Sequence, residues 1–256
     1  MRADFPCVET MPAPSELAIL TAACLLAAAL YSSVGHGGAS AYLAAMGFAG
    51  ISPLIMKPSA LVLNIFVSAL ALFFFGKGGH WKGGLFWPLA AASVPAAFLG
   101  GWLHASDPVF KSVLAAALLF ASWQLAFLKK KGAGEIRVLP PWGAVLLGCG
   151  LGFLSGLVGI GGGVFLTPLL ILFRWAETKT AAAISAAFIL VNSVSGLFGF
   201  SVRGGAIPEL AWWLLPGVVL GGVIGSSWGS RKAPPLLLRR CLALVLATAA
   251  VKFAVV

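Results

Sequence analysis

The chain has 256 residues, of which 60% are hydrophobic and 9% are charged. A soluble domain of this length cannot bury so much apolar surface, so the composition excludes the soluble classes and predicts a protein whose helices face lipid. The formal net charge is +10. The basic residues lie in short segments between apolar runs rather than on one face, so no nucleic-acid partner is expected.

The apolar runs predict an all-α, polytopic membrane protein. Residues 1–16 hold one basic and three acidic side chains, the wrong charge for a signal peptide, and are interpreted as a polar tail. A basic linker over 129–141 separates a first transmembrane repeat, 17–128, from a second, 142–256. Helices are expected over 17–34, 39–49, 58–75, 85–103, 109–128, 142–158, 164–173, 178–200, 210–228 and 236–256.

The two halves repeat one another. Residues 33–40 read SVGHGGAS and residues 157–164 read LVGIGGGV, and each glycine cluster interrupts an apolar run. An apolar helix with an asparagine follows each cluster, and the repeat relates Asn64 to Asn192. A duplicated, glycine-broken apolar segment is typical of secondary transporters built from two repeats. We therefore expect two homologous repeats, each with a glycine-broken unit followed by three transmembrane helices.

Loop charges indicate how the broken units meet the membrane. If each unit crosses once, eight segments cross and the 17 Lys and Arg residues divide nine to eight. If each unit is a re-entrant hairpin, six helices cross and the division is five to twelve, which satisfies the positive-inside rule with the N-terminus outside the cell membrane. We favour the hairpins, which make the repeats inverted. The 17–18 residues of the first arms argue for eight crossings.

The acidic residues favour an anionic substrate. All seven lie in tails or loops, whereas cation transporters and carboxylate proton relays place acids at mid-membrane. Where a helix breaks and restarts, its N-terminus presents unpaired N–H groups and the positive end of the helix dipole, and glycine lets a ligand approach the backbone. Two facing breaks would bind a small oxyanion. The alternative is that the glycines only permit close helix packing.

The candidate substrate-binding residues are those of the two clusters and the two asparagines: Gly35, His36, Gly37, Gly38, Ser40, Asn64, Gly159, Gly161, Gly162, Gly163 and Asn192. Lys57 and Ser155 are secondary candidates. Lys57 either supplies a charge near the site or extends to the membrane interface. Each asparagine either binds substrate or joins helices by hydrogen bonds.

His36 is the side chain near the breaks that changes charge near neutral pH. It either carries a proton coupled to transport or bonds a carbonyl at the break, and the proton can instead travel on the anion. No cofactor is expected, and coupling to protons or to sodium stays open. The four cysteines show no metal-binding spacing and no span holds a catalytic set, so neither a metal site nor an enzyme is expected.

The expected partners are the small anion and the lipid bilayer. The oligomeric state is open, with a homodimer among the options. An anion channel is the alternative function, because glycine-lined anion sites also serve channels.

A longer motif surrounds the second cluster. Residues 154–168 read LSGLVGIGGGVFLTP and precede an Ala- and Ser-rich helix over 180–196. This pattern resembles the signature of the TauE/SafE family of sulfite exporters, and the resemblance covers nearly the whole chain. It implies transport of sulfite, sulfoacetate, sulfonates or related organic anions, with a small carboxylate as the alternative. The first cluster departs from the pattern at His36, where the second has Ile160.

Overall fold

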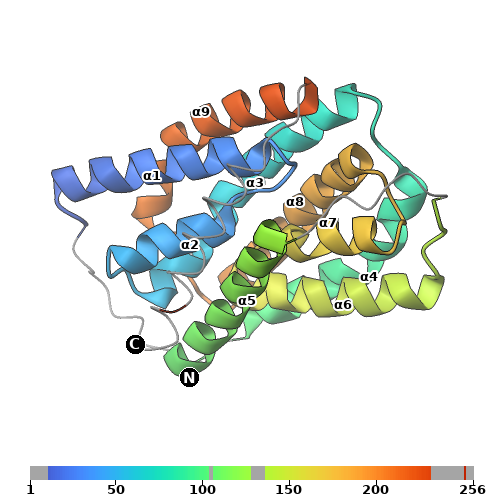
Figure 1. Cartoon of the computed structure of the whole chain (residues 1–256). Coiled ribbons are helices and arrows are strands. Elements are labelled where there is room, and N and C mark those ends of the chain that lie inside the picture. Colours follow the sequence, from blue (N-terminus) through green and yellow to red (C-terminus); the bar gives the residue numbers. More distant parts are fainter. Residues whose placement is uncertain (1–10, 104–105, 128–135, 232–250, 252–256) are drawn as a thin grey trace.

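The computed structural model describes residues 11–103, 106–127, 136–231 and 251 (Figure 1). The N-terminal ten residues, most of the linker and nearly all of the helix expected over 236–256 lie outside this range. Within it the chain forms helices and no strands, as the hydropathy predicts. The helices are α1 (Pro14–Ser32), α2 (Ala39–Phe48), α3 (Pro53–Lys77), α4 (Gly83–Trp102), α5 (Asp107–Phe127), α6 (Pro141–Val158), α7 (Gly163–Leu172), α8 (Thr178–Val202) and α9 (Glu209–Arg231).

The start of α3 differs from the prediction. The sequence offers two prolines as helix starts, and Pro58 was expected to open the helix, but α3 begins at Pro53 and Pro58 lies inside it. Both prolines precede an apolar run, so hydropathy alone does not choose between them. The extra residues carry Lys57 into the helix, where its side chain is buried.

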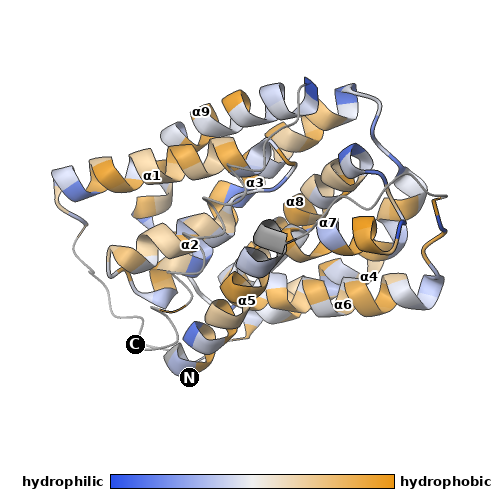
Figure 2. Cartoon of the chain, viewed as in Figure 1, coloured by the Kyte–Doolittle hydropathy of each residue, from blue (hydrophilic) through white to orange (hydrophobic). Residues whose placement is uncertain are grey.

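Six of the described helices are long and apolar enough to cross a membrane, namely α1, α3, α4, α6, α8 and α9. Apolar residues predominate along these helices (Figure 2), and large hydrophobic side chains such as Trp87 and Trp142 are mostly exposed. Such a surface is stable only when lipid covers it. The chain is therefore a multi-pass membrane protein.

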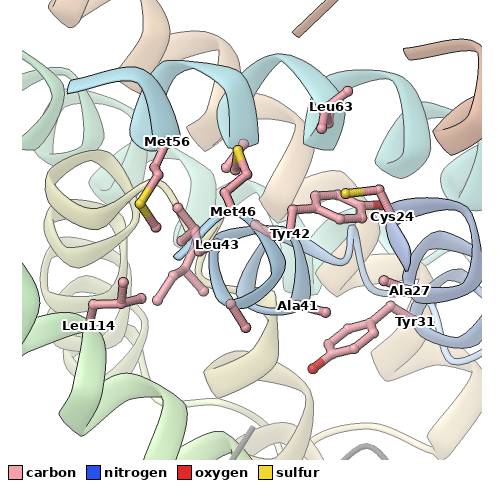
Figure 3. Close-up of a cluster of buried hydrophobic side chains, with 14 of the residues drawn as sticks. Cys24, Ala27, Tyr31, Ala41, Tyr42, Leu43, Met46, Met56, Leu63 and Leu114 are labelled. Atoms are coloured by element: carbon pink, nitrogen blue, oxygen red, sulfur yellow. The ribbon is translucent and has the colours of Figure 1, made fainter. Parts of the chain in front are cut away.

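Each glycine cluster folds its unit into a hairpin. α2 runs back beside α1 (Figure 1), and Tyr42 of α2 lies beside Cys24, more than two turns before the end of α1 (Figure 3). In the second unit, a Cβ built on Gly162 would lie 3.2 Å from the carbonyl oxygen of Leu151, again two turns back along α6. These hairpins have the shape that the loop charges favour. Their placement relative to the membrane stays a prediction, because α1 and α6 are themselves long enough to cross.

Helices of one half pack directly against helices of the other half. α1 packs on α9 and α4 packs on α6, so the first helix of each half lies beside a late helix of the other (Figure 1). Both contacts use glycines spaced four residues apart, where an added Cβ would meet backbone or side-chain atoms of the partner helix. The glycines are Gly217, Gly221, Gly225 and Gly229 of α9, and Gly148, Gly152 and Gly156 of α6.

The central pair, α3 and α8, crosses antiparallel. Phe75 near the end of α3 clusters with Ala182 near the start of α8, and the Nζ of Lys57 near the start of α3 lies 6.0 Å from the ring centroid of Phe200 near the end of α8. Both helices have 25 residues, so their midpoints meet. This crossing places the middle of each helix between the two glycine breaks.

Candidate functional site

The backbone of each break requires glycine. Gly35 and Gly38 have φ values of 79° and 94°, and Gly159, Gly161 and Gly162 have values of 84°, 81° and 73°. Residues with a Cβ rarely adopt this left-handed conformation. Gly37 is different, because its φ is not positive. It is restricted by contact instead: a Cβ there would collide with the side chain of Asn64.

Both breaks leave a run of backbone donors without acceptors. In the first, the N–H groups of residues 37–40 make no hydrogen bond within the described residues, and the bonding of α2 resumes with Ala41 donating to Gly38. In the second, the N–H groups of residues 160–164 are likewise unbonded, and the bonding of α7 resumes with Phe165 donating to Gly162. These donors lie at the positive ends of two helix dipoles.

Asn64 of α3 joins the two breaks. Its Nδ2 donates a 3.3 Å hydrogen bond to the carbonyl oxygen of Ile160 in the second break. Its Oδ1 faces Gly37 in the first break, where a Cβ would strike it, and a Cβ on Gly161 would lie 2.7 Å from Nδ2. The side chain is completely buried. The structure therefore brings Gly37, Gly161 and Asn64 together, as expected for a shared site.

α8 presents Ile189, rather than Asn192, to the same place. A Cβ on Gly37 would lie 3.1 Å from the Cγ2 of Ile189, and one on Gly161 would lie 2.8 Å from it. Ile189 is the twelfth residue of α8, as Asn64 is of α3. By position within the helix, Asn64 therefore corresponds to Ile189, three residues before Asn192. Asn192 is buried, and its amide makes no hydrogen bond with the described residues.

Polar side chains surround the first break. Ser40 Oγ and Tyr31 Oη are 3.1 Å apart and hydrogen-bonded, and Tyr42 Oη donates to the carbonyl oxygen of Gly37 at 2.7 Å. The ring of His36 stands edge-on to Tyr31 with centroids 6.4 Å apart, and the His36 N–H donates to the Tyr31 carbonyl. All four side chains are buried.

The two tyrosines were not among the predicted site residues. They are the only tyrosines of the chain, and they flank the first glycine cluster on either side. That placement was a usable signal, since a buried tyrosine hydroxyl normally finds a polar partner.

Apolar side chains surround the second break. Ile160 and Val164 are buried there, and a Cβ on Gly163 would strike Ile189. A Cβ on Gly162 would lie 2.9 Å from the ring of Phe188. The Ser155 carbonyl oxygen accepts a 2.8 Å hydrogen bond from the N–H of Gly159. The hydroxyl of Ser155 is buried and has no hydrogen-bond partner among the described residues.

Lys57 is buried rather than extended to the interface. Its Nζ donates to the carbonyl oxygens of Gly100, Gly101 and Leu103 at 3.3, 3.2 and 3.5 Å. These carbonyls lie at the C-terminus of α4, the negative end of its dipole, where a cation is favoured. The backbone of Lys57 also lies against the second break, because a Cβ on Gly159 would be 3.0 Å from its carbonyl oxygen.

The acidic residues that the structure describes lie at helix starts. Glu16 and Glu209 are in the first turns of α1 and α9, and Glu177 is the N-cap residue of α8. These positions stabilise the helix dipoles. Among the described residues, no group of His, Cys, Asp or Glu is arranged to hold a metal ion.

Residues 20–253 match the family described as the sulfite exporter TauE/SafE. The chain belongs to the TauE/SafE family. A probable membrane transporter protein of Sinorhizobium fredii, y4hK, is 38% identical to this TauE/SafE chain over 238 residues, which cover 91% of this chain and 96% of the relative.

A second relative, a probable membrane transporter protein of Haemophilus influenzae, is 24% identical over 79% of this chain and 81% of its own length. No solved structure matches. Together with the six apolar helices, membership of the TauE/SafE family makes the chain a membrane transporter. The family and the names of the relatives point to transport rather than catalysis.

Proposed function

We propose that this TauE/SafE chain carries a small oxyanion, such as sulfite or a related organic anion, across the cell membrane and binds it between the two glycine breaks. The observation that supports the proposal is the pair of unbonded N–H runs at residues 37–40 and 160–164, joined by Asn64. Backbone donors at helix N-termini bind anions without a buried arginine. Discontinuous helices hold substrates this way in other transporters.

The charges of the described residues support an anion over a cation. No carboxylate of this set lies in the interior of a helix, so nothing there would hold a transported cation. Lys57 donates to three carbonyls at the C-terminal end of α4, which leaves the breaks themselves as the positive feature of the site. Coupling of the anion to protons or to sodium is part of the proposal.

The proposal is tested by calorimetric titration of the purified chain with sulfite, sulfate, thiosulfate, sulfonates and small carboxylates. We expect saturable binding of at least one anion and saturable transport in proteoliposomes. Current that does not saturate with concentration would indicate a channel instead.

A matched pair of glycine variants locates the site. Gly161→Val should lower affinity by about 100-fold or more, because its Cβ would lie 2.7 Å from Asn64 Nδ2 and 2.8 Å from Ile189 Cγ2 and would displace the groups at the break. Gly79→Val is the control: its φ of 75° is nearly that of Gly161, but no atom lies within 4 Å of an added Cβ. Equal affinity in both variants would show that the breaks do not bind the anion.

A further inference from the structure

The orientation of the Asn64 amide is determined by its surroundings. Nδ2 donates to the carbonyl oxygen of Ile160 at 3.3 Å. Turning the amide over would bring its oxygen against that carbonyl, and two acceptors cannot bond one another. Oδ1 therefore points toward Gly37, where it is buried and accepts no hydrogen bond from the described residues. A buried acceptor without a donor is costly, so this oxygen calls for an explanation.

The two breaks that Asn64 joins also contain donors without partners among the described residues. They are the N–H groups of residues 37–40 and 160–164. The first break also has a spare hydroxyl proton, because Tyr31 and Ser40 carry two hydroxyl protons and share a single hydrogen bond. A ligand that satisfies this site must accept many hydrogen bonds and donate one.

We propose that the ligand is an oxyanion that retains one proton, and that its O–H donates to Asn64 Oδ1 while its other oxygens accept from the two N–H runs. The inference rests on the proposed function and narrows its substrate class. Singly protonated anions such as hydrogen sulfite or bicarbonate have the required donor. Sulfate and simple alkyl sulfonates are fully ionised and have none.

The unequal halves give the ligand one orientation. Ile189 occupies the position in α8 that Asn64 occupies in α3, and its side chain has no acceptor. The O–H of the anion therefore points toward the first break. A proton bound to the anion in this way crosses the membrane with it, without titration of any side chain.

The test uses two pairs of anions in which a methyl group replaces the hydroxyl. Bicarbonate is paired with acetate, and hydrogen sulfite, at mildly acidic pH, is paired with methanesulfinate. We expect the purified full-length chain to bind the hydroxyl member of each pair about 10- to 100-fold more tightly, because the methyl member leaves Oδ1 unpaired. Calorimetry or a thermal-shift titration measures the ratio.

Variants assign the preference to Asn64. Asn64→Leu should bring the two members of each pair within about threefold of one another, since no acceptor remains to discriminate them. Ser195→Ala is the control, because it removes a hydrogen bond from α8 to the Val94 carbonyl of α4 and should keep the preference. If Asn64→Leu does not fold, the comparison of anions on the unaltered chain still decides.

The outcomes separate this inference from the proposed function. Equal binding of both members of each pair by the unaltered chain would overturn the inference and leave the oxyanion site standing. Binding of neither member, with no binding of any anion in the wider screen, would overturn both.

Discussion

The two glycine breaks have similar backbones and different side chains. Both have positive-φ glycines and a run of unbonded N–H groups. α2 and α7 have ten residues each, and the residues His36, Ser40 and Tyr42 of the first break correspond to Ile160, Val164 and Leu166 of the second. In the proposed function, attraction of the anion is therefore a backbone property that both halves share. The proposed orientation of the anion and any handling of its proton depend on side chains of the first half.

The central helices differ in the same way. Lys57 of α3 packs against Gly159 of the second break, and its counterpart Ala182 of α8 packs against Gly35 of the first. A Cβ on Gly35 would lie 2.5 Å from the Ala182 Cβ. Each break thus packs against the central helix of the other half. Only the contact at the second break involves a charged residue, Lys57.

The largest expected effect concerns membrane topology, that is, whether the two hairpins enter from opposite sides of the membrane. If the repeats are inverted, the linker and the last loop face the cytoplasm together. In a cysteine-free background, Ala133→Cys and Ala233→Cys should both be labelled from the cytoplasmic side, and Ala206→Cys only from outside. Labelling of Ala133→Cys and Ala233→Cys from opposite faces would support eight crossings and remove the inverted arrangement of the breaks.

The second largest effect concerns Lys57, whose backbone packs against Gly159 of the second break. Lys57→Met leaves three carbonyls at the C-terminal end of α4 without their donor, and should lower the free energy of unfolding by about 2–4 kcal/mol. Lys179→Met is the matched variant, because Lys179 of α8 donates to one carbonyl, that of Ser230 in the last turns of α9. It should cost about 1 kcal/mol or less. Denaturation in detergent measures both, and an equal loss would show that burial of Lys57 adds nothing.

The smallest effect concerns His36, which has no titratable counterpart in the second break. If the proton travels on the anion, His36→Gln should keep the pH dependence of transport and change its rate by about fivefold or less, the effect of one neutral hydrogen bond. Transport in proteoliposomes over a range of external pH measures this. A flattened profile would instead make His36 the proton carrier.

Much of the fold could be predicted from the sequence because its signals are local. Hydropathy predicted the described helices, and the glycine clusters predicted the breaks that bound α2 and α7. The predicted start of α3 was wrong because Pro53 and Pro58 both precede an apolar run and both suit the first turn of a helix. Local patterns also suggested Asn192 as the partner of Asn64, since both follow similar apolar residues.

Tertiary contacts decided which side chains reach the breaks. Ile189 faces Gly161 because α3 and α8 cross antiparallel at their midpoints, and this register depends on packing between helices more than a hundred residues apart. The same crossing places Asn64 between the breaks, and the packing of α2 on α1 places Tyr42 beside Cys24.

The sequence by itself determined a membrane transporter of the TauE/SafE family with two glycine-broken helical units, because composition and backbone preference depend on the residues themselves and their local order. Only the tertiary structure decided that the two breaks share one asparagine, Asn64, and that Ile189 rather than Asn192 lies beside it. Both contacts depend on the register between α3 and α8. Packing between these distant helices sets that register, and no local sequence pattern predicts it.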